Sequence, residues 1–165
     1  MSLITGLHHV TVIAGDAQET LDFYMQVLGM RLVKRSVNQD DPGTYHLFFA
    51  DGDGHPGSDL TFFPWPHMPP GRTGAGLTTE VALAVPLDSL DYWGERLAQH
   101  NVRMGERTTR FGETVLPFTD PHGLALALVA TGDPRTFTIW DGSPVPAIRQ
   151  IRGLHAVRMT ERALE

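Results

Sequence analysis

Residues 7–14 of the chain read LHHVTVIA, and this stretch decides the fold. The apolar, β-branched residues that follow its His pair predict a strand, which Gly15 ends. Asp16 is a suitable N-cap for a helix over 17–28, and Gly29 is a suitable C-cap. Three further strands are expected, at 31–37, 44–50 and 59–63. The first part of the chain therefore has the order β-α-β-β-β.

The same order recurs after a stretch rich in Pro and Gly at 64–76. Its expected elements are a strand at 79–85, a helix at 86–100, and strands at 102–107, 112–118 and 124–130. The sequence thus predicts tandem βαβββ modules, the first over 4–66 and the second over 77–131. We expect an α+β fold in which these modules form a curled mixed sheet with helices on the outer face.

A shorter repeat lies near the end of the chain, where residues 153–157 read GLHAV and echo GLHHV at 6–10. Residues 132–152 carry the proline punctuation of a linker. A third module is therefore expected to begin at 153, with only 153–165 present. A lone first strand would leave its backbone groups unpaired, so we expect either a truncated product or a piece of a longer protein.

Composition excludes several classes of function. The 165 residues hold 13 Lys and Arg against 19 Asp and Glu, with no basic cluster, so no nucleic acid partner is expected. No apolar run is long enough to cross a membrane and no signal peptide begins the chain, so a cytoplasmic protein is expected. The absence of cysteine leaves His and carboxylate as metal ligands, which favours iron, manganese or zinc.

The His pair is the strongest candidate for chemistry. Successive residues of a strand point to opposite faces. If Val10 and Val12 pack under the helix, His9 and Thr11 face the concave side of the sheet, where His9 could bind a metal. His8 would lie at the mouth of the strand, able to hydrogen-bond or exchange a proton with a ligand. The alternative is ordinary polarity at the start of a surface strand.

Eight segments in a fixed order extend this pattern. They are Gly6–Thr11, Asp22–Tyr24, Val27–Gly29, Arg31–Lys34, Asp40–Leu47, Leu60–Pro66, Arg110–Gly112 and Asp120–Leu124. Together they resemble the glyoxalase/bleomycin resistance/extradiol dioxygenase superfamily, also called the vicinal oxygen chelate superfamily. Within it, the chain is most similar to the N-terminal half of hydroquinone-type ring-cleaving dioxygenases.

The resemblance implies a non-haem Fe(II) site, with Mn(II) as an alternative, that binds O₂ and a small aromatic diol or hydroquinone. It makes His9 a metal ligand and places His8 and Thr11 in the substrate pocket as catalytic residues. The other two ligands of the family lie in a later module. The strands at 60–63 and 125–129 contain no carboxylate, so the site would be completed by a C-terminal half or by a partner chain in a homodimer.

Other interpretations stay open at this point. The missing carboxylate favours a non-catalytic small-molecule-binding protein of the bleomycin-resistance type, acting as a dimer, while a glyoxalase-like isomerase ranks last. Glu80 is either a ligand in a half-size site or a solvent-facing strand residue. Tyr45 and His46 suit a structural pair. Turn roles are expected for Asp51, Asp53, His55, Asp59, Asp120 and His122.

Overall fold

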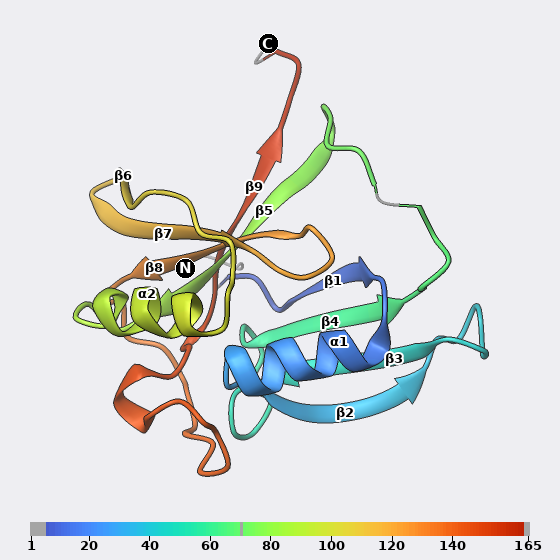
Figure 1. Ribbon diagram of the computed structural model, residues 1–165, viewed down its shortest axis with the longest axis horizontal. Coiled ribbons are helices and arrows are strands. Elements are labelled where there is room, and N and C mark those ends of the chain that lie inside the picture. The colour runs from blue at the N-terminus through green and yellow to red at the C-terminus, as the bar shows by residue number, and fades with distance from the viewer. Residues whose placement is uncertain (1–5, 70, 164–165) are drawn as a thin grey trace, which may run out of the picture.

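The computed structural model describes residues 6–69 and 71–163. Within these residues the strands form two mixed sheets, with the orders β1-β4-β3-β2 and β6-β7-β8-β5-β9 (Figure 1). The α+β class and the tandem βαβββ order are confirmed, and the strands divide into two sheets where the prediction has one curled sheet. The helices lie against the sheets from outside, with α1 along the first sheet and α2 beside the second (Figure 1).

The first unit begins with a strand and a capped helix. Its elements are β1 (His9–Ala14), α1 (Ala17–Leu21), η1 (Asp22–Val27), β2 (Arg31–Val37), β3 (Tyr45–Ala50) and β4 (Asp59–Pro64). Asp16 caps α1 as predicted, because its carboxylate accepts the amides of Gln18 and Glu19 at 2.8 and 3.0 Å. The helix continues as a π-helix, η1, which buries two consecutive aromatic residues, Phe23 and Tyr24.

The second unit repeats this order. Its elements are β5 (Leu77–Val85), α2 (Leu90–Gln99), β6 (Thr108–Arg110), β7 (Glu113–Thr119) and β8 (Ala125–Ala130). The predicted strand at 102–107 is wrong, since only Met104 forms an isolated bridge there, to Phe118. The neighbouring position on β7 is Pro117, which has no N–H to donate and only accepts, from the Gly105 amide. A regular ladder therefore begins only at Thr108.

The two units correspond residue by residue at their first strands. β1 pairs in parallel with β4, and β5 pairs in parallel with β8. Where each pair ends, the next residue donates its amide back to the first strand: Trp65 to the Ala14 carbonyl at 2.8 Å and Thr131 to the Val85 carbonyl at 3.0 Å. Ala14 and Val85 are therefore equivalent positions. Counting back along both strands makes His9 equivalent to Glu80.

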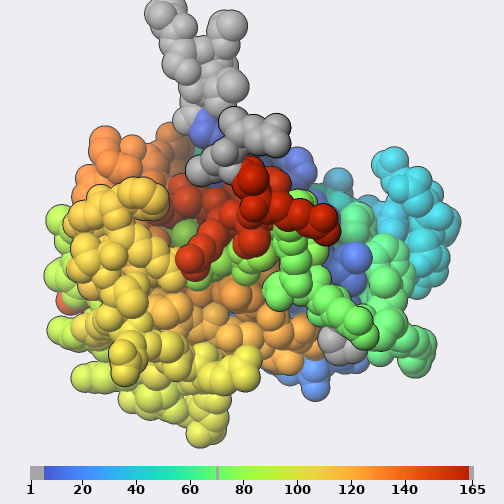
Figure 2. Space-filling model, turned by 90° about the horizontal axis from the view of Figure 1, so that it is seen from above, coloured from blue at the N-terminus to red at the C-terminus, as the bar shows by residue number. Residues whose placement is uncertain are grey.

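The strand of the third repeat is not alone. β9 (Gly153–Thr160) pairs antiparallel with β5, from Gly153 opposite Ala84 to Thr160 opposite Leu77. Figure 2 shows the end of β9, in red, against the start of β5, in green. The expectation that this strand is unpaired is therefore wrong for the edge of β9 that faces β5. Gly153 also lies close to Gly57, whose carbonyl oxygen would be 2.6 Å from an added Cβ.

Residues 132–152, predicted as a linker, are held against the first unit. Thr138 donates its amide to the Asp51 carboxylate at 2.8 Å and accepts the Gly52 amide at the same distance. A short 3₁₀ turn, η2 (Ala147–Arg149), precedes β9. The buried side chain of Gln150 accepts the Trp140 amide through Oε1 and donates to the Trp140 carbonyl through Nε2. In residues 6–69 and 71–163, no helix has the length and apolar character to cross a membrane.

Candidate functional site on the first sheet

The register of β1 and β4 brings polar side chains onto one open face. His9 lies opposite Asp59, and Thr11 lies opposite Thr61, in neighbouring parallel strands. Residues opposite one another in such a pair share a face. His9 and Thr11 are both exposed, while Val10 and Val12 pack against the core on the other side.

The two histidines contact each other directly. Their Nδ1 atoms lie 3.1 Å apart, and the rings meet edge to face at an interplanar angle of 87°. The prediction that they point to opposite faces is therefore wrong, because His8 precedes the first residue of β1 and does not follow its alternation. One Nδ1 must donate and the other must accept, so Nε2 of His9 stays outside this hydrogen bond.

A directed chain of hydrogen bonds runs across three strands to Thr11. The Thr61 hydroxyl donates to Oγ1 of Thr11 at 2.9 Å, and Nε2 of His46 lies 3.0 Å from Oγ1 of Thr61. A threonine hydroxyl has one hydrogen, and that of Thr61 is already given to Thr11. His46 must therefore donate through Nε2. Thr11 then receives a hydrogen bond and keeps its own hydroxyl hydrogen for a ligand on the exposed face.

Aromatic rings hold His46 in this position. Its ring lies between Phe48 and Phe63, with centroid distances of 4.0 and 4.1 Å. Burial, with the positive charges of Lys34 and His9, lowers the pKa of His46 below its ordinary value. His46 is thus favoured as a neutral ring with its proton on Nε2, as the chain requires.

Asp59 is the carboxylate beside the histidine pair. Burial raises its pKa above the ordinary value, although His8 and His9 act in the opposite direction. No group of three or more His, Asp or Glu residues that could hold a metal ion is present in residues 6–69 and 71–163. The described residues therefore do not form a complete three-ligand site.

Three members of this face do not stand out in the sequence. Asp59 groups with the preceding turn and His46 with a structural pair, and Thr61 belongs to no motif that predicts a role for it. Alternation within each strand puts all three on the face of His9, but only the register between strands shows that they are neighbours. On the second sheet, the solvent-facing interpretation of Glu80 is wrong, because its side chain is 9% exposed and paired with Arg110.

The comparisons with known proteins agree with this architecture. The Glyoxalase/Bleomycin resistance protein/Dioxygenase superfamily matches residues 6–128. The chain belongs to this superfamily.

Among its relatives, MhqO of Bacillus subtilis (strain 168), provisionally named a ring-cleaving dioxygenase, is 44% identical over 150 residues. That match covers 90% of this chain and 48% of MhqO. The chlorohydroquinone/hydroquinone 1,2-dioxygenase of Sphingobium indicum is 35% identical and is covered to 49%. The chain therefore spans about half the length of these curated relatives.

Solved structures show the same relationship. A provisionally named dioxygenase from Bacillus subtilis superposes with a TM-score of 0.83 at 42% identity, over 92% of this chain and 48% of that one. A glyoxalase family protein from Enterococcus faecalis superposes with a TM-score of 0.64 at 21% identity. That second match covers 78% of this chain and 99% of the other, and it shows that the two proteins share a fold.

Proposed function

We propose that this chain supplies one side of the active site of a ring-cleaving dioxygenase, in which His9 binds the metal and Thr11 binds the aromatic substrate. The hydrogen-bond chain from His46 through Thr61 carries the proposal, because it leaves Thr11 as a donor on an open face next to His9. The oxygen of a phenol or phenolate is the natural acceptor for such a donor. The names of the relatives support a dioxygenase-type reaction on an aromatic ring.

The chain's own residues would bind and orient the ring. Ile13 and Phe63 lie opposite one another on the same face as Thr11 and offer apolar contact. His8 would hydrogen-bond a second substrate oxygen, or exchange a proton with it, through the nitrogen not used toward His9. Fe(II), or Mn(II), would contribute the binding of O₂, but the ligands that complete its site must come from a second half or a partner chain.

Metal content and oxygen uptake test this proposal. The purified chain is titrated anaerobically with Fe(II) or Mn(II) at equilibrium, without desalting, because its described residues supply too few ligands to hold the ion tightly, and hydroquinone and O₂ are then added. We expect weak metal binding by the native chain and by His100→Ala, an exposed His at the C-cap of α2, and a measurable loss of that binding in His9→Ala. Thr11→Val should keep the metal and weaken hydroquinone binding.

One observation favours a second candidate function, a metal-free binding protein of the bleomycin-resistance type. It is the absence of a three-ligand cluster within residues 6–69 and 71–163. Equal, low metal content in the native chain and His9→Ala, with aromatic ligands bound equally well by both, would establish this second function and contradict the first. Light scattering of the same samples shows whether either activity requires a dimer.

A further inference from the structure

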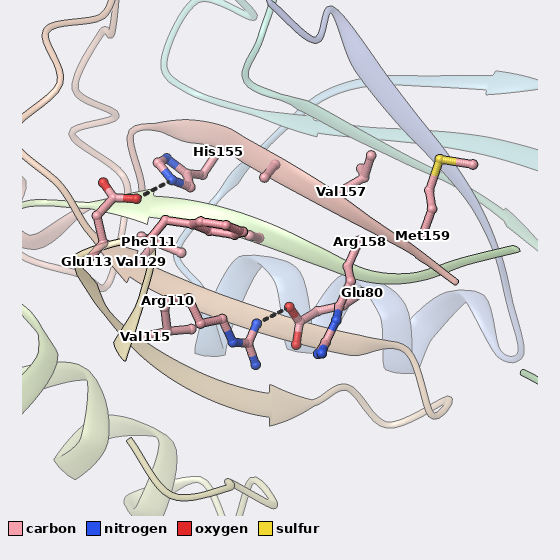
Figure 3. A pocket seen from close by; sticks show the side chains of 12 residues that line it. Glu80, Arg110, Phe111, Glu113, Val115, Val129, His155, Val157, Arg158 and Met159 are labelled. Carbon is pink, nitrogen blue, oxygen red and sulfur yellow. Dashed lines mark hydrogen bonds and ion pairs between the residues drawn. The ribbon is translucent and has the colours of Figure 1, made fainter. Parts of the chain in front are cut away.

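The second sheet has a hollow of its own, away from His9. A cavity of about 590 Å³ lies on its concave face, within the range of about 300–1,000 Å³ that is usual for small-molecule sites. Its floor is made of short aliphatic side chains, chiefly Ala82 on β5, Val115 on β7 and Val129 on β8. Figure 3 shows charged side chains from the surrounding strands standing around this floor.

Two ion pairs bridge the hollow from side to side. Glu80 on β5 pairs with Arg110 on β6, and Glu113 on β7 pairs with His155 on β9 at 2.8 Å. In each case three strand spacings separate the partners in the sheet order. That separation is roughly 14 Å on a flat sheet, so the pairs close only because the sheet curls.

Stability alone does not account for these pairs. Glu80 is 9% exposed and Arg110 is 30% exposed, so both lose much of their hydration. A buried ion pair adds little net stability, and apolar side chains of the same size often replace it without loss. Large apolar residues here would also fill the hollow, whereas the chain keeps Ala82 at its floor. An apolar floor with a few polar groups around it is the usual arrangement of a small-molecule site.

Phe111 gives independent evidence for a ligand. It lies in the two-residue turn between β6 and β7, with φ of +51° at Phe111 and +85° at Gly112, as a type I′ turn requires. Asn or Gly suits the first of these positions, and an aromatic residue there is strained. The side chain is also fully exposed at the edge of the cavity, and no residue of 6–69 or 71–163 covers it. A flat ligand in the cavity would give this ring a partner.

The remaining hydrogen-bonding groups define the ligand. The ion pairs use Oε1 of Glu80 and Oε2 of Glu113, and the second oxygen of each carboxylate has no hydrogen-bond partner in the described part of the chain. An ionised carboxylate only accepts, so the ligand must bring donors. Arg158 also lines the cavity, so the two carboxylates face two guanidinium groups and the lining carries no excess of negative charge. We propose that this cavity is a second binding site, which takes a small, flat aromatic alcohol.

Binding of 2-naphthol, followed by its fluorescence and by calorimetry, tests the proposal. We expect saturable binding at one site, and we expect naphthalene, which has no hydroxyl, to bind at least about tenfold more weakly than 2-naphthol. Ala82→Leu fills the floor and should abolish this binding. Ala98→Leu, the same change at an exposed position of α2, should leave it intact, and both variants should keep the native circular dichroism spectrum. The site lost in Ala82→Leu should persist in His9→Ala.

Phe111→Asn separates a binding role from a structural one. Asn fits the turn better, so its melting temperature should be unchanged or higher while naphthol affinity falls severalfold. The proposal is overturned if Ala82→Leu binds 2-naphthol normally, or if naphthalene and 2-naphthol bind equally well. It is also overturned if the native chain binds no 2-naphthol; a changed oligomeric state of Ala82→Leu would then identify the hollow as a contact between proteins.

Discussion

Tyr24→Phe tests how the two units are held together. The buried hydroxyl of Tyr24, on η1 of the first unit, donates to Oδ2 of Asp120 at 3.1 Å, in the turn before β8 of the second unit. Asp120 is 5% exposed, so water cannot replace the lost donor. The other carboxylate oxygen keeps the amides of His122 and Leu124, at 2.9 and 2.8 Å. The substitution therefore removes one bond and leaves the turn itself intact.

A buried acceptor left without its donor costs roughly 1–3 kcal/mol, and an ionised one lies in the upper part of that range. We expect the free energy of unfolding to fall by about 2 kcal/mol at neutral pH, and the melting temperature by roughly 4–8 °C. Tyr45→Phe is the matched control, since Tyr45 is 49% exposed and its hydroxyl makes no hydrogen bond within residues 6–69 and 71–163. Tyr45→Phe should change neither the free energy of unfolding nor the melting temperature.

The loss should depend on pH in a defined direction. Burial raises the pKa of Asp120 above its ordinary value, while the bonds from Leu124, Tyr24 and His122 lower it. A folded pKa above the unfolded one favours the protonated form in the native state, so the stability this gives is lost as pH rises through the folded pKa. Without the Tyr24 hydroxyl this pKa rises further. Tyr24→Phe should thus cost most near about pH 7.5 and less near about pH 5. Urea unfolding at both pH values measures this, and an equal loss at both, or none, would refute the reasoning.

Three further predictions concern other contacts. Gly153→Ala should lower the free energy of unfolding by more than about 2 kcal/mol, because φ is +127° and the new Cβ would meet the Gly57 carbonyl; amide exchange along β9 reports it. Arg96→Lys should lose about 1 kcal/mol or more in urea unfolding, since an ammonium cannot reproduce the guanidinium's bonds to the carbonyls of Val27 and Gln26. The lowered pKa of His46 gives stability that is present above the unfolded pKa of about 6.5 and is lost as pH falls below it, so His46→Gln should flatten that part of the stability profile in thermal melts.

The repeated order of elements is what the sequence predicts best. The strand at 31–37 has the same bounds in the structure, and Asp16 caps its helix as expected, because capping and alternation depend on neighbours in the chain. The strand at 102–107 fails for a non-local reason: its partner position across the sheet is Pro117, which cannot donate. The predicted orientation of His8 and His9 toward opposite faces fails for a local reason, since alternation holds only after the strand has begun.

The candidate site could be predicted only in part, because its members come from different strands. The His pair and Thr11 are visible as a motif, whereas His46 and Thr61 become neighbours through the register of β3 and β4 and through a diagonal contact. The ion pair between Glu80 and Arg110 is even harder to predict from the sequence. It depends on the curl of a whole sheet, which no short pattern of residues encodes.

The pairing of β9 with β5 also bears on how this protein can be shortened. A chain ending at Arg152 would keep both predicted modules whole by sequence, yet it would uncover one entire side of β5, where Val81 and Leu83 now have partners in β9. A bare hydrogen-bonding edge on an apolar strand invites pairing between molecules. The shortest piece that does not associate through the edge of β5 should therefore run to Thr160, one strand beyond the end of the second repeat.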